Sequence, residues 1–98
     1  RPKHVTPKQV VERTARYFSV SIDDIISPKR DKEIVYPRQV AMYMLRSELH
    51  MSFPKIAIEL GRKDHTTAIH SVEKIEKEAN LDAGVRQQLV EIRGRLYA

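Results

Sequence analysis

Hydrophobic residues recur at helical spacing along most of the chain, and each apolar stretch begins beside a residue that favours a helix start. Thr6 and Pro7 combine an N-cap hydroxyl with proline at the first helical position. The pattern that follows predicts a helix from Pro7 to Phe18. Ser21 predicts the cap of a short second helical turn, whose isoleucines we expect to pack on the core: Ile22, Ile25 and Ile26.

The middle of the chain predicts a polar loop and two further helices. Ser27–Glu33 is charged and contains a proline, which indicates a loop. Pro37 then predicts the start of a third helix that runs to about His50. Ser52 predicts the cap of a short fourth helix, and Gly61 can adopt the left-handed conformation that ends such a helix.

Two more helices complete the predicted fold. Apolar positions at helical spacing predict a fifth helix that begins near Asp64 and ends at Asn80 or Leu81. Asp82 predicts the cap of a sixth helix to the end of the chain. Because no segment alternates strictly between apolar and polar residues, we expect an all-α fold of about six helices. Residues 53–79 have the lengths of a helix-turn-helix.

Composition narrows the class of partner. The chain has 98 residues, which suit one domain, and its net charge of +5 favours DNA, RNA or an anionic membrane surface. The absence of cysteine excludes disulfides and thiolate metal sites, and agrees with a reducing cytoplasmic location. Since the first residue is Arg1 rather than methionine, we expect the chain to be a piece of a longer protein.

The turn before the fifth helix carries the most specific chemistry. Gly61, Arg62 and Lys63 precede Asp-His-Thr-Thr at the expected helix start, where a recognition helix presents side chains to the major groove. Aspartate can accept a hydrogen bond from cytosine, and threonine can contact a thymine methyl group. The alternative is that Asp64 and the threonines only cap the helix. The adjacent cations and the helix-turn-helix spacing favour DNA binding.

Other basic residues have less specific signals. Arg30 lies in a charged loop and could enter the minor groove of A·T-rich DNA, or could simply be solvated beside its acidic neighbours. Arg38, Gln39 and Arg46 could reach phosphates, or could lie on an exposed helix face.

Metal binding and catalysis have little support in the sequence. His65 and His70 are five residues apart, which separates them on a helix, and no third ligand is near. The chain lacks a glycine-rich phosphate loop and a nucleophile with recognisable partners. We therefore expect no enzyme activity and no metal in this segment.

Three motifs resemble one family. Ile34–Leu45, Phe53–Ile56 and Leu60–Ile69, with Lys-Asp-His-Thr-Thr inside the last, are similar to the C-terminal DNA-binding domain (domain IV) of DnaA, the bacterial chromosomal replication initiator. The resemblance runs from about His4 to Ala98. It implies a six-helix domain with a Trp-repressor-like helix-turn-helix. It also implies binding to DnaA boxes of the replication origin and of some promoters, one monomer per box.

The resemblance also implies roles for single residues. Arg30 corresponds to a minor-groove arginine, Arg46 to a residue that reaches a guanine, and Pro54 to one that touches a thymine methyl group. The major-groove base contacts are expected from Asp64, His65 and Thr66. Contacts to the DNA backbone are expected from Arg38, Gln39, Arg62, Lys63 and Thr67.

Four positions depart from the family pattern. Ala57 and Arg62 stand where glycine is common, Ala68 stands for valine, and Arg46 stands for the commoner lysine. The two alanines are packing changes that we expect to leave the function intact. Arg62 could alter phosphate contacts, and Arg46 leaves its base preference less defined because its guanidinium differs in geometry from an amine.

Longer members of this family carry an upstream ATPase domain. ATP and magnesium are therefore expected only there, as are contacts with anionic phospholipid or regulatory proteins. Two other functions stay open. One is a basic helical module for an acidic protein or anionic lipid, which would use a last helix bearing Arg86, Arg93 and Arg95. The other is a stand-alone helix-turn-helix transcription regulator.

Overall fold

The computed structural model describes residues 4–98, which form helices and no strands. The helices are α1 (Pro7–Tyr17), α2 (Ile22–Ile25), α3 (Lys32–Leu49), α4 (Phe53–Glu59), α5 (His65–Leu81) and α6 (Ala83–Leu96). The predicted all-α fold of about six helices is confirmed.

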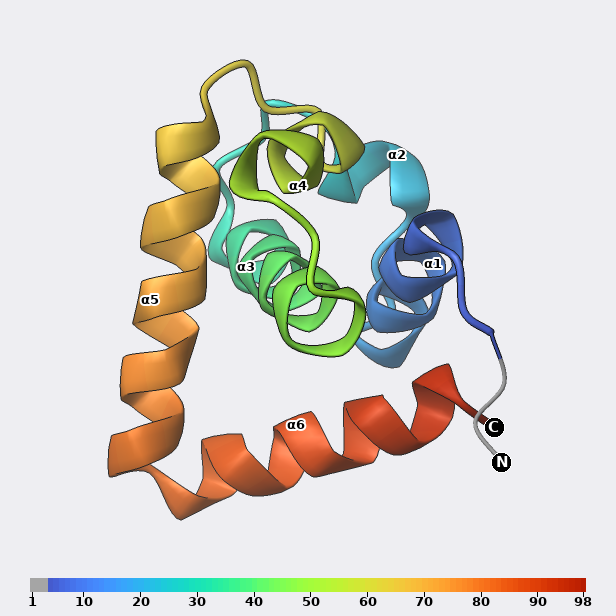
Figure 1. The fold of residues 1–98 in the computed structure, drawn as a ribbon, viewed down its shortest axis with the longest axis vertical. Coiled ribbons are helices and arrows are strands. Elements are labelled where there is room, and N and C mark those ends of the chain that lie inside the picture. Colours follow the sequence, from blue (N-terminus) through green and yellow to red (C-terminus); the bar gives the residue numbers. More distant parts are fainter. Residues whose placement is uncertain (1–3) are drawn as a thin grey trace.

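Helix α3 lies at the centre of the molecule. It packs against α5 on one side and α1 on the other, while α6 crosses below from the end of α5 to α1 (Figure 1). Val40, Met44 and Leu45 of α3 are fully buried. Burial of a side chain of this size contributes about 1.5–3 kcal/mol, so α3 is the element on which the other helices are positioned.

Side-chain caps define the helix starts. A side-chain oxygen accepts a backbone N–H of the first turn at Thr6, Ser21, Ser52, Asp64 and Asp82. Each such cap satisfies an N–H that has no partner inside the helix, and typically stabilises by about 1 kcal/mol. These five caps match the sequence predictions, so the predicted starts of α1, α2, α4, α5 and α6 are confirmed.

The predicted start of α3 at Pro37 is wrong. The helix begins five residues earlier at Lys32, and Pro37 lies inside it. The carbonyl of Asp31 accepts the N–H groups of Ile34 at 2.9 Å and Val35 at 2.8 Å, which closes the first turn before the proline. Proline has no N–H and removes one helical hydrogen bond, but it follows the residues whose N–H groups close the first turn. The first turn therefore forms without it. The polar loop is correspondingly shorter than predicted.

Helix α6 closes the core. Leu89, Ile92 and Leu96 are buried, whereas Arg93 forms an ion pair of 2.8 Å with Glu48 of α3. The apolar face of α6 is therefore covered by the domain itself, which leaves it unavailable to a separate partner.

The prediction that Ile26 packs on the core is wrong, because 38% of the residue is exposed. Among residues 4–98, no helix has the length and apolar character needed to cross a membrane.

Candidate nucleic-acid interface

The helix-turn-helix is formed by α4, the turn at residues 60–64, and α5. Gly61 has a φ of +69°, which a residue with a side chain rarely adopts. A Cβ atom at this position would lie 2.4 Å from the carbonyl oxygen of Ile26. The turn is closed by the N–H of Arg62, which donates to the carbonyl of Ala57 at 2.8 Å. Gly61 therefore allows the turn to approach the loop after α2 closely.

The first turn of α5 exposes its predicted contact residues. Asp64 is the N-cap, and its Oδ1 accepts the N–H of Thr66 at 2.9 Å. The capping role that the sequence left open is thus realised, and it does not prevent a DNA contact because the side chain remains at the surface. Five consecutive side chains are exposed here: Lys63, Asp64, His65, Thr66 and Thr67. They lie together at the N-terminal end of α5.

The hydrogen bond from Thr66 lowers the pKa of Asp64 below its ordinary value of 3.8. Since the folded pKa lies below the unfolded one, the cap stabilises fully above pH 3.8 and this contribution is lost as pH falls through the folded pKa. We predict that Asp64→Asn, which retains a capping oxygen, removes this part of the acid sensitivity. Thermal unfolding of both proteins between about pH 2 and 6 measures it. Parallel pH curves would contradict the prediction.

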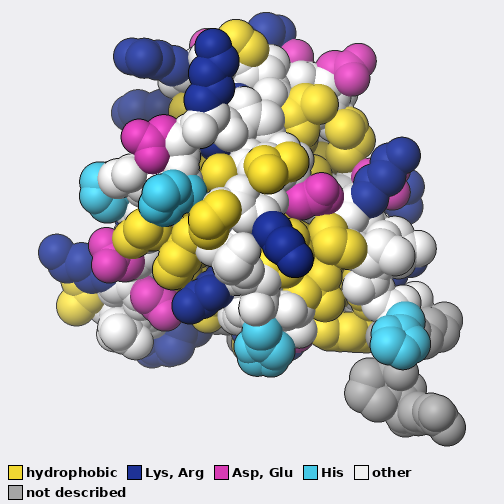
Figure 2. Space-filling model, turned by 45° about the horizontal axis from the view of Figure 1, so that its top comes forward, with side chains coloured by type: hydrophobic (Ala, Val, Ile, Leu, Met, Phe, Trp, Pro, Cys, Tyr) yellow, Lys and Arg dark blue, Asp and Glu magenta, His cyan; other side chains and the backbone are white. Residues whose placement is uncertain are grey.

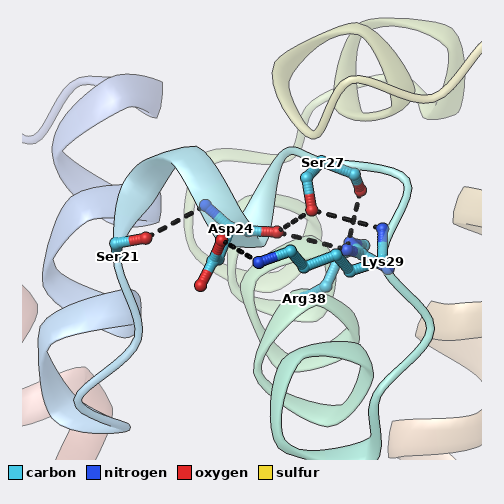
Figure 3. Close-up of polar contacts among 5 residues, drawn as sticks. All are labelled: Ser21, Asp24, Ser27, Lys29 and Arg38. Atoms are coloured by element: carbon cyan, nitrogen blue, oxygen red, sulfur yellow. Dashed lines mark hydrogen bonds and ion pairs between the residues drawn. The ribbon is translucent and has the colours of Figure 1, made fainter.

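The loop of residues 27–31 that carries Arg30 is anchored at its base. Lys29 Nζ lies 2.9 Å from Asp24 Oδ1, and the N–H of Lys29 donates to Ser27 Oγ at 3.2 Å (Figure 3). Arg30 itself is exposed. Its side chain borders a hollow of about 350 Å³ whose other lining residues come from α3 and α5: Lys32, Val35, Tyr36, Gln39 and Lys74.

A second hollow, of about 540 Å³, separates this loop from the helix-turn-helix turn. Ile26 at the end of α2 and Pro28 of the loop line one side of it. The turn and α5 line the other side, with Gly61, Arg62, Lys63, Asp64 and Thr67. The loop that carries Arg30 therefore lies beside the start of α5, with Pro28 two positions before Arg30 at the edge of this hollow. Figure 2 turns the top of Figure 1, which carries the α4–α5 turn, toward the viewer; Lys and Arg side chains are scattered over the visible face among hydrophobic and acidic ones.

Arg38 has a structural role that the sequence did not predict. It is only 5% exposed, and it donates to the carbonyl of Ile25 at 2.7 Å. It also donates to the carbonyls of Ser27 at 2.8 Å and Asp24 at 3.4 Å (Figure 3). Burial lowers the pKa of Arg38, and the charge of Arg62 lowers it further. Arg38 lies on the same face of α3 as the buried Ala41 and Leu45, three and seven positions later, which makes the predicted phosphate contact poorly accessible.

Arg62 is half-buried and also points into the protein. Its Nε donates to the carbonyl of Leu60 at 2.9 Å, and its Nη2 donates to the carbonyl of Ile26 at 3.1 Å and to that of Ser27. Burial lowers the pKa of its guanidinium. The neighbouring Lys63 is exposed and remains the more accessible cation of the pair.

The remaining predicted residues lie on α3 and α4. Arg46 is exposed, donates to the carbonyl of Met51 at 2.7 Å and lies 4.2 Å from the centre of the Phe53 ring. Pro54 is exposed in the first turn of α4. Gln39 is half-buried, and its side-chain oxygen accepts from Lys74 Nζ at 3.0 Å. Arg46 and Pro54 thus lie at the junction of α3 and α4.

Sequence reasoning misses Lys74 as a candidate. Its amine contacts Gln39, forms an ion pair of 2.9 Å with Glu78, and lies 5.5 Å from the centre of the Tyr36 ring. Its spacing could have identified it, because Lys74 lies seven residues after Thr67 and hence on the same helix face. Within residues 4–98, no three His, Cys, Asp or Glu side chains are grouped to hold a metal.

The sequence comparisons all point to one family. A family model described as bacterial dnaA protein helix-turn-helix matches residues 7–75. The chain is 41% identical over 95 residues to the chromosomal replication initiator protein DnaA of Thermomicrobium roseum, covering 97% of this chain and 20% of that protein. It is 43% identical over 94 residues to the same protein of Limosilactobacillus fermentum, covering 96% and 22%.

Solved structures agree. A crystal structure of a DNA replication initiation factor superposes with a TM-score of 0.83 at 33% identity, covering 93% of this chain and 28% of that one. AMPPCP-bound DnaA from Aquifex aeolicus superposes with a TM-score of 0.71 at 34% identity, covering 88% of this chain and 27% of that one. The chain spans about a fifth of the length of its curated relatives, and the matched part is their helix-turn-helix rather than an ATPase. Because the family model matches more than half of the chain, this protein belongs to the bacterial DnaA helix-turn-helix family.

Proposed function

We propose that this domain binds double-stranded DNA in replication initiation and recognises DnaA boxes, at the chromosomal origin and at some promoters, through two adjacent grooves. DNA binding in replication initiation is the function that family membership supports. The observation that carries the two-groove proposal is the hollow shared by the loop before Arg30 and the exposed start of α5. Two elements that suit different grooves lie beside each other there.

In this proposal the start of α5 enters the major groove. His65 and Thr66 are exposed at the helix end and supply hydrogen bonds and apolar contact to base edges. Asp64 accepts a hydrogen bond from a cytosine amine while it caps the helix. Arg46 and Pro54 extend the base contacts from the junction of α3 and α4.

The DNA backbone is held by the residues around these base contacts. Lys63 and Thr67 are exposed beside the recognition residues, and Gln39 with Lys74 borders the hollow under Arg30. Contacts of this kind set the register on the duplex without reading its sequence. We assign Arg38 to positioning the loop instead of to a phosphate, because its donors are already bound to carbonyls.

We predict that Thr66→Ala and His65→Ala each weaken binding to a DnaA box by about 1–3 kcal/mol and weaken binding to a scrambled duplex much less. The reason is that a base contact exists only on the correct sequence. Fluorescence anisotropy titrations with both duplexes measure the difference, and Lys63→Ala serves as a control that weakens both alike. An equal loss on both duplexes would show that Thr66 and His65 hold the backbone.

We predict that Arg30→Ala weakens box binding by about 1–3 kcal/mol and that the loss is largest when the A·T-rich end of the box is intact. A guanidinium gains most from a narrow, electronegative minor groove. The same titration with a box whose A·T pairs at that end are replaced by G·C pairs measures the dependence. Unchanged box binding by the variant would remove the minor-groove contact from the proposal.

Further parts of the proposal concern the longer protein. We propose one monomer of this single domain per box, and an upstream ATPase domain that binds ATP and magnesium, as the AMPPCP-bound Aquifex DnaA binds a nucleotide analogue. We likewise propose that contacts to anionic phospholipid or to regulatory proteins are made by the longer protein.

A further inference from the structure

We propose that Arg62 is a positioning residue that joins the helix-turn-helix turn to the Arg30 loop and so fixes the separation of the two DNA-contacting elements. The inference rests on the proposed two-groove function. It assigns Arg62 a task inside the protein, where the sequence alone suggested a phosphate contact.

The first observation is the direction of the Arg62 side chain. All its hydrogen bonds run to carbonyls, and two of these belong to residues that are 36 and 35 positions earlier in the chain, Ile26 and Ser27. The third, from Nε to Leu60, holds the guanidinium at the turn itself. One side chain therefore bridges the turn and the loop.

The second observation is that the bridge ends on a rigid support. The carbonyl of Ser27 also accepts from Arg38 at 2.8 Å, so two arginines from α3 and the turn share it. The backbone of Gly61 approaches Ile26 so closely that a Cβ would lie 2.4 Å from its carbonyl oxygen. Residues 25–27 are thus held from both sides.

The third observation is the short distance along the chain to Arg30. Only Pro28 and Lys29 separate it from Ser27. Proline fixes its own φ, and Lys29 is bound through its amine to Asp24 and through its N–H to Ser27. Arg30 therefore extends from a base whose position depends on Arg62. An element held in its bound position before binding loses less freedom on binding.

The side chain that can do this must be arginine. Its planar fork donates in several fixed directions, whereas lysine carries a compact charge at the end of a flexible chain. Arg62→Lys keeps the charge and so preserves a phosphate contact, but it loses the simultaneous bonds to Leu60, Ile26 and Ser27. The substitution separates the two roles.

The experiment is a double-mutant cycle of Arg62→Lys and Arg30→Ala on a DnaA box duplex, read by anisotropy. Arg30→Ala should weaken binding by a factor that is about five times or more larger in the wild-type background than in the Arg62→Lys background. The reason is that two residues coupled through the same loop do not have independent effects. Lys63→Ala is the matched control: it removes an exposed neighbouring cation, and its effect should simply multiply with that of Arg30→Ala.

Amide hydrogen exchange of the free protein provides a readout without DNA. We expect residues 27–31 to exchange faster in Arg62→Lys and in Arg62→Gln, with the rates in α3 and α5 unchanged. The second variant serves if the first lowers the overall stability.

Multiplicative effects in the cycle, or unchanged exchange of the loop, would each overturn the role of Arg62. If wild-type protein shows no preference for the box over a scrambled duplex, the proposed function fails, and the exchange still decides whether Arg62 orders the loop. If the preference is present but the cycle is multiplicative, only the positioning role fails.

Discussion

Replacing Gly61 with alanine is expected to destabilise the domain by about 2–4 kcal/mol and to weaken DNA binding. Two independent effects add at this position. The backbone has a φ of +69°, which disfavours any residue with a Cβ, and the new methyl group would lie 2.4 Å from the carbonyl oxygen of Ile26. The turn or the loop must move, and either movement separates Arg30 from the start of α5.

Urea unfolding of the variant measures the first part of this prediction, and box titration measures the second. Gly94→Ala is the matched control, because Gly94 lies inside α6 and an added Cβ would meet no atom within 4 Å. Alanine there should stabilise by up to about 1 kcal/mol, since glycine is a poor helix former. Equal stability of the two variants would contradict the described turn.

Replacing Arg38 with methionine is expected to cost about 2–3 kcal/mol of stability. Methionine fills much of the same volume, so the main loss is that of the donors to the carbonyls of Ile25 and Ser27, at 2.7 and 2.8 Å. The carbonyl of Ile25 loses this donor and remains poorly solvated, whereas that of Ser27 keeps its bond from Arg62. The loop that carries Arg30 should loosen at the same time.

Arg46→Met is the control for Arg38→Met. Arg46 is exposed and donates to the carbonyl of Met51 alone, so its replacement should change stability by less than about 1 kcal/mol. DNA binding should fall in both variants. Arg38→Met loosens the loop that carries Arg30, and Arg46→Met removes a DNA contact. Urea unfolding measures both stabilities. An equal loss of stability in the two variants would show that Arg38 is not a structural arginine.

The helix starts could be predicted because their causes are local. A serine, threonine or aspartate three or fewer residues before an apolar period suffices to place a cap, as at Ser52 and Asp82. The start of α3 could not be predicted in this way. Pro37 has the usual signature of a helix start, and only the turn closed by the carbonyl of Asp31 shows that the helix has already begun.

The exposed part of the site followed from the sequence, whereas its support did not. The residues from Lys63 to Thr67 are consecutive, so a helix start places them together. Arg38 and Arg62 meet at Ser27 across 11 and 35 positions, and no periodicity encodes such a contact. Charge alone therefore suggested phosphate contacts for two arginines that hold a loop.

The most direct test of DnaA-box recognition is a titration of the wild-type domain with a DnaA box duplex and a scrambled duplex of equal composition, at about 50 and 200 mM salt. We expect both affinities to fall steeply with salt, and the box to bind about a hundredfold or more tighter at each concentration. Equal affinities for the two duplexes at both salt concentrations would contradict sequence-specific recognition and favour a basic module that binds any polyanion.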